Sequence, residues 1–94
     1  MKLLGQLEAK LFLQGHPAHA DMLHSWLSEI RFRRWRTSGA LAADFRSADT
    51  STSPRVVFRL GRPTLVIETI IDFRKEIVLL TEIRTAATEP VQLN

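Results

Sequence analysis

The stretch RVVFRLGRPTLVIETIIDFRKEIVLLTEIR, residues 55–84, decides the fold of this chain. Three of its segments, 55–60, 64–71 and 76–84, are rich in Val, Ile and Thr, which is typical of β-strands. The two connections between them have the length of hairpin turns. The stretch therefore predicts three strands that form an antiparallel meander.

The residues before the meander carry helical patterns. Five leucines between residues 3 and 13 recur with roughly helical spacing, and Gly15 stands where a helix C-terminus is expected. His16-Pro17 then interrupts the chain. An amphipathic first helix is the prediction for this segment.

Two further helices are expected after His16-Pro17. An apolar stripe at i, i+3 and i+4 predicts a second helix over about residues 18–32, with Trp26 in the core. Thr37 or Ser38 can cap a short third helix. The polar segment 46–55 that follows predicts a loop.

Together these patterns predict one α+β domain over residues 1–94, with N-terminal helices packed on one face of a small, mainly antiparallel sheet. On the first strand of the meander, Val56 and Phe58 alternate with Arg55 and Arg59. Because successive side chains of a strand point to opposite faces, both arginines should lie on the face away from the helices.

Charge is concentrated in the middle of the chain. Residues 31–64 contain eight arginines and two aspartates, whereas the segments on either side are slightly acidic. Such a bias favours a phosphate-bearing partner, since the planar guanidinium group binds phosphate through two hydrogen bonds. There is no cysteine, which excludes disulfides and thiolate metal sites. No apolar run approaches the roughly 20 residues that span a bilayer. We expect a cytoplasmic protein without cofactor, metal or membrane contact.

The densest basic segment is RFRRWR, residues 31–36, and it has two interpretations. Its arginines can simply end the second helix, with Trp35 in the core. Alternatively, Trp35 stacks on a nucleic-acid base while Arg36 contacts the backbone. Arg74 and Lys75 occupy the tip of the second hairpin, where they are either solvated or in contact with RNA.

Five short motifs follow one another along the chain in a recognisable order. They are His16-Pro17, Trp26, Trp35-Arg36, Ala43-Asp44-Phe45-Arg46-Ser47-Ala48 and Arg55-Val56-Val57-Phe58-Arg59. In order and spacing they resemble the HigB-type toxins of bacterial toxin–antitoxin pairs, within the RelE/ParE group. The resemblance covers about residues 3–85.

The resemblance implies a small cytoplasmic mRNA interferase, an endoribonuclease that cleaves mRNA on the ribosome and inhibits translation. A helix-turn-helix antitoxin would neutralise it. Cleavage of this kind needs cations around the phosphorane, and arginine supplies charge without exchanging protons. The predicted catalytic cations are Arg59, Arg74 and Arg84. The predicted RNA-binding residues are Arg55, Arg36, Trp35 and Lys75.

The chain departs from the family pattern where the last strand ends. The family has Thr-His-x-Glu-Tyr-Asp there, whereas this chain keeps Thr85, replaces the His by Ala86 and contains no Tyr at all. The remaining candidates for proton transfer are Lys75, Glu68, Glu82 and Glu89. Without the His and Tyr, we expect an attenuated toxin.

Two other functions fit the same sequence. A toxin-like module that has lost catalysis would still bind RNA, the ribosome or an antitoxin, and its RNA binding would weaken steeply with salt. A ParE-like protein would instead inhibit DNA gyrase. The basic middle segment is compatible with all three, so charge alone does not choose between them.

Overall fold

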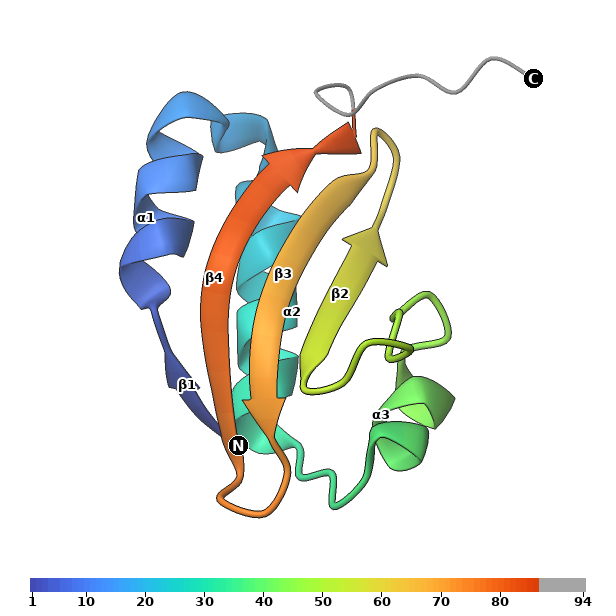
Figure 1. The fold of residues 1–94 in the computed structure, drawn as a ribbon. Helices are drawn as coiled ribbons and strands as arrows, with labels where there is room; N and C mark the ends of the chain where they lie inside the picture. Colours follow the sequence, from blue (N-terminus) through green and yellow to red (C-terminus); the bar gives the residue numbers. More distant parts are fainter. Residues whose placement is uncertain (87–94) are drawn as a thin grey trace, which may run out of the picture.

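The computed structural model describes residues 1–86 and shows three helices packed on a four-stranded mixed sheet (Figure 1). The elements are β1 (Lys2–Leu4), α1 (Gln6–Gly15), α2 (Ala20–Phe32), α3 (Ser38–Asp44), β2 (Arg55–Leu60), β3 (Leu65–Asp72) and β4 (Ile77–Thr85). A short 3-10 helix, Pro17–His19, joins α1 to α2. The coarse α+β prediction is confirmed.

The sheet has the strand order β1-β4-β3-β2. Strand β2 pairs antiparallel with β3, and β3 pairs antiparallel with β4, which confirms the predicted meander. Strand β1 adds to the far edge of β4 in parallel. In Figure 1, α2 passes behind the sheet and α1 lies beside it, while within residues 1–86 no helix covers the opposite face. We call this opposite face the open face.

The predicted first helix is wrong at its start, because the chain begins with β1. Leu3 is buried and pairs with Val78 of β4, whereas Lys2 and Leu4 are exposed, which is the alternation of a strand. Gly5 then ends the strand with φ of +84°, in the left-handed region that glycine adopts without cost. The helix starts only after this turn.

The leucines of α1 differ in their environment. Leu7 and Leu11 are 64% and 51% exposed, whereas Leu13 packs against the core beside Ala9 and Phe12, the buried residues of the helix. The leucine spacing therefore predicts the helix correctly but does not mark its buried residues.

Helix α2 is close to its predicted bounds, and its C-terminus has an unusual partner. The α-amine of Met1 donates hydrogen bonds to the carbonyls of Ile30, Arg31 and Arg33. The last carbonyls of a helix lack intrahelical donors and carry its negative dipole end. A positive amine therefore stabilises this terminus and ties the start of β1 to the end of α2.

Aromatic side chains join the helices to the sheet. Phe58 of β2 is fully buried and makes edge contacts with Trp26 of α2 and Phe45, with ring centroids 5.2 and 5.3 Å apart. This confirms Trp26 as a core residue. Helix α3 begins as predicted, since the Thr37 hydroxyl accepts a hydrogen bond from the amide of Ala40 at 3.1 Å.

None of the helices in residues 1–86 combines the length and apolarity that a membrane crossing requires.

Candidate nucleic-acid interface

The first strand of the meander presents its arginines to the open face, as predicted. Val56 and Phe58 are fully buried on the helix side, whereas Arg55 and Arg59 are exposed. On β3, Glu68 is directly opposite Val57, so it lies on the same open face as the two arginines. The strand alternation thus gathers charged groups of both signs on this surface.

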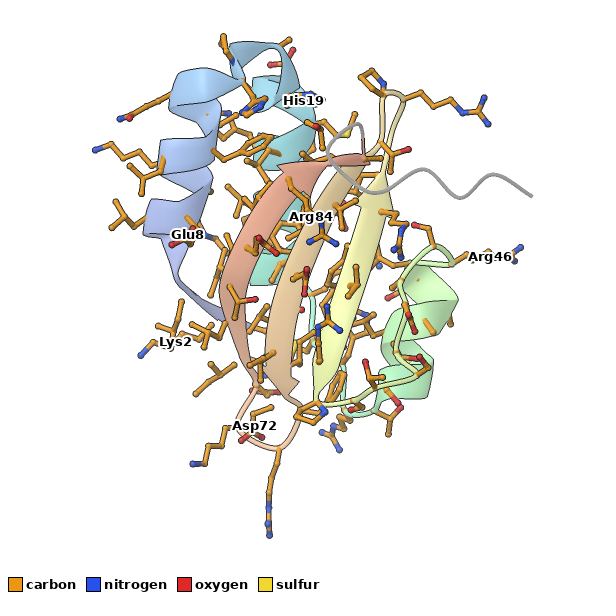
Figure 2. All side chains as sticks on the ribbon, turned by 45° about the horizontal axis from the view of Figure 1, so that its top comes forward. Lys2, Glu8, His19, Arg46, Asp72 and Arg84 are labelled. Atoms are coloured by element: carbon orange, nitrogen blue, oxygen red, sulfur yellow. The ribbon has the colours of Figure 1, made fainter. Side chains whose placement is uncertain are left out.

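A β-bulge decides which residues of β4 join them. The register shifts between Glu68 and Thr69, and Thr81 is the extra residue on β4. Without it, Glu82 would be opposite Ile67 on the buried side; with it, Glu82 is opposite Glu68 and Arg84 is opposite Val66. Figure 2 shows Arg84 over the open face.

Glu68 is the centre of the ion-pair network that results. Its Oε1 accepts hydrogen bonds from Nε of Arg55, at 2.9 Å, and from Nη2 of the same side chain. Its Oε2 accepts from Nη1 of Arg84, which also donates to Glu82 at 3.0 Å. One carboxylate therefore bridges arginines from the strands on either side of it.

This environment holds the Glu68 carboxyl in its charged form. The hydrogen bonds from Arg55, and next those from Arg84, lower its pKa from 4.5 to about 2, although partial burial acts in the opposite direction. The Glu68 side chain is 13% exposed, against 52% for Arg55. Glu68 is thus the enclosed member of the network, and Arg55 is the solvent-facing one.

Arg59 is the arginine of the open face that remains available. Within residues 1–86 its guanidinium group makes no hydrogen bond or ion pair, and its side chain is exposed. The charge of Arg59 acts on Asp49. The pKa of Asp49 is lowered first by hydrogen bonds from Ser51 and then, more weakly, by the charges of Arg59 and Arg55.

The other predicted cations lie elsewhere. Arg74 and Lys75 belong to the β3–β4 turn, at the end of the sheet opposite the β2–β3 turn (Figure 1). Arg74 and Arg36 line a common hollow with Phe73 and Glu76. Arg74 therefore does not join Arg59 and Arg84 in one catalytic group. It forms a second basic region, which we call the turn region.

The prediction of Trp35 as a stacking surface is wrong. Its residue is 2% exposed, its ring packs on Phe45, and its Nε1 donates to Asp44 at 2.7 Å. An indole that is enclosed and hydrogen-bonded in this way belongs to the core. The aromatic side chain that the RFRRWR segment does expose is Phe32, at 86%.

Two of the four arginines of that segment are paired within the chain. Arg31 donates to Gln6, and Arg33 forms ion pairs with Glu29 and Asp44. These contacts support the interpretation in which the segment ends α2 and joins it to α1 and α3. Arg36 is the member that reaches the turn region.

Glu68 of the open face is poorly suited to accept a proton at neutral pH. A general base works best when its pKa lies near the working pH, and Glu68 is far below it. His16, His19 and His24 belong to the helical layer, where His16 stacks on Phe12. Glu89, the remaining acidic candidate, lies outside the described residues. Among residues 1–86, no three His, Asp or Glu side chains gather as metal ligands.

No family model matches the chain, and no curated protein matches it either.

The network predicts a specific dependence of stability on pH. A folded-state pKa below the unfolded value of 4.5 contributes stability that is complete above that value and is lost as the pH falls toward about 2. Urea unfolding at pH 5 and at pH 3 should show a larger loss for the wild type than for Glu68→Gln. Equal losses in both proteins would show that Glu68 is not held in its charged form.

Proposed function

We propose that this chain is a HigB-type toxin of the RelE/ParE group that binds RNA with its open face and inhibits translation. The motifs in residues 16–59 support the family assignment. The packing of the helices on one face of an antiparallel meander agrees with this assignment. In this proposal the protein is cytoplasmic, its targets are mRNA and the ribosome, and a helix-turn-helix antitoxin is its partner.

The observation that carries the proposal is that Arg55, Arg59 and Arg84 share one face of the sheet, which no helix in residues 1–86 covers. They come from two strands that flank β3, so the spacing of the strands sets the spacing of the guanidinium groups. Arginine is the side chain best suited to bind phosphate groups along a nucleic-acid backbone. Binding of this kind weakens as salt rises.

The same surface favours binding over rapid cleavage. Arg55 and Arg84 are already paired with Glu68, and these contacts hold the pKa of Glu68 at about 2, far from the neutral pH at which a general base would work. Acid–base assistance is typically worth about 10²–10⁴-fold in rate. The proposed toxin therefore cleaves slowly, or acts as a non-cleaving module that occupies RNA or the ribosome.

Arg59→Ala is the variant that tests this proposal. Expression of the wild type should arrest growth, and Arg59→Ala should relieve the arrest, because it removes the open-face guanidinium that no carboxylate holds within residues 1–86. Growth curves with mapping of mRNA 5′ ends measure both toxicity and cleavage. New 5′ ends identify an endoribonuclease, and arrest with intact mRNA identifies the non-cleaving module.

Arg46→Ala is the matched control. Arg46 is exposed and points away from the sheet in Figure 2, and its replacement removes the same charge. This variant should arrest growth like the wild type. Equal toxicity of the Arg59 and Arg46 variants would contradict a role for the open face. A DNA-damage response without any effect on translation would instead identify a gyrase inhibitor.

A further inference from the structure

The arrangement around Glu68 has the form of an occupied anion site. Arg55 approaches one carboxylate oxygen from β2, and Arg84 approaches the other from β4. Two guanidinium groups that hold the two oxygens of a singly charged group would hold a phosphodiester in the same manner. The ligand of this pair is, however, supplied by the chain itself.

The strand pairing holds the backbone of Glu68 at the centre of the open face. Its backbone is paired on both sides, with Val57 of β2 and Glu82 of β4, and its carbonyl also accepts a hydrogen bond from the Thr81 hydroxyl at 3.0 Å. An incoming phosphate must therefore bind next to a fixed negative charge or take the arginines from it. Either route weakens binding, since like charges repel strongly at a partly buried site.

Arg55 is able to change partners. Its side chain is half exposed, and it reaches Glu68 diagonally across the strand pair from a position opposite Ile70. Rotation of this long side chain toward solvent leaves the buried core residues of β2 in place. Removal of the Glu68 charge would thus release arginine donors toward a ligand without dismantling the sheet.

We propose that Glu68 is the affinity-setting residue of the open face: its carboxylate occupies the place between Arg55 and Arg84 that an RNA phosphodiester would take. This inference rests on the proposed function, because it assigns the ligand as RNA. The native chain then binds RNA weakly, because the Glu68 carboxylate already occupies the donors of the two arginines. Loss of the Glu68 charge alone converts it into a tighter binder.

The test is the affinity of Glu68→Gln for a fluorescently labelled single-stranded RNA oligonucleotide, measured by anisotropy over a series of KCl concentrations. At low salt we expect binding about five- to ten-fold tighter than that of the wild type. The slope of log K against log salt should steepen by about 0.7 to 1.4, the contribution of one or two added phosphate contacts. Circular dichroism verifies that the variant is folded. If Glu68→Gln does not fold, Glu68→Thr is used in its place, because threonine is favoured in strands.

Glu8→Gln is the matched control. It removes the same charge from the exposed side of α1, outside the open face and outside the Glu68 network. It should alter the affinity by less than about two-fold.

Glu68→Gln binding as weakly as the wild type, or more weakly, would overturn the inference while leaving the proposed function intact. An equal gain from both glutamate variants would overturn it too, because net charge would then explain the effect. If neither the wild type nor the variants bind RNA at low salt, the proposed function fails and the inference fails with it.

Discussion

Gly5→Ala is expected to lower the free energy of unfolding by about 3 kcal/mol or more. Gly5 has φ of +84°, and a Cβ at this position would lie 2.3 Å from the backbone carbonyl oxygen of Leu80. A left-handed conformation disfavours any side chain, and the obstacle is the backbone of β4 rather than a flexible side chain. The new methyl group would push β1 and the start of α1 away from the sheet.

Urea unfolding followed by the fluorescence of Trp26 and Trp35 measures this loss. Gly15→Ala is the control, because a Cβ at Gly15 would meet nothing within 4 Å and Gly15 has no positive φ. That variant should be unchanged or more stable by up to about 1 kcal/mol. If the two alanine variants were equally stable, the close approach of Gly5 to β4 would be wrong, and with it the placement of β1.

Phe58→Ala is expected to have a comparable or larger effect, about 3–5 kcal/mol. Phe58 is fully buried, and its ring contacts Trp26 of α2 and Phe45 after α3. Removal of the ring leaves a cavity where the sheet meets both helices. Since a small domain has only about 5–15 kcal/mol of stability, this loss removes a large share of it and should shift the urea midpoint strongly downward.

Near-ultraviolet circular dichroism and urea unfolding measure this effect, and Phe58→Leu provides a milder variant that retains most of the volume. Phe32→Ala is the matched control, since the same side chain is removed at a position that is 86% exposed. It should alter stability by no more than about 0.5 kcal/mol. Similar losses at Phe58 and Phe32 would contradict the position of the core.

The meander could be predicted from the sequence because its signals are local. The Val- and Ile-rich runs, the short connections and the alternation along 55–60 all describe neighbouring residues, and the structure confirms each of them. The cap at Thr37 is equally local. The same alternation correctly assigned Arg55 and Arg59 to the open face.

The errors arose where distant residues decide the structure. The segment 2–4 is a strand only because the edge of β4 is available to pair with it. The residues next to Trp35 in the sequence are basic and aromatic, which is typical of an exposed binding surface. In the folded chain, however, Asp44 and Phe45 enclose Trp35. Neither contact can be deduced from the residues that flank these positions.

The candidate site was predicted in part for the same reason. The arginines of β2 follow from alternation, whereas the position of Arg84 depends on the bulge at Thr81, which strict alternation along β4 does not include. The bridging role of Glu68 requires the register of three strands at once. Arg74 was grouped with the open face on charge alone, and the turn places it in another region.

The pairing of Arg55 and Arg84 with Glu68 changes how the open face would act on RNA. A surface of unpaired arginines would bind nucleic acid strongly and without discrimination. A surface whose central arginines are held by an internal carboxylate binds weakly unless the ligand offers a better arrangement of charge. In the proposed function, the Arg59 guanidinium, which no carboxylate holds within residues 1–86, would bind a phosphate more readily than Arg55 or Arg84.

The proposed function requires the open face to contact RNA. Titration of the ¹⁵N-labelled chain with a single-stranded RNA oligonucleotide at low salt, followed by backbone amide NMR spectra, tests this contact directly. The shifts should be concentrated in residues 55–59, 66–70 and 82–84, and α1 and α2 should be unaffected. Shifts confined to the helices or to the turn region, or no shifts at all, would contradict the proposed contact.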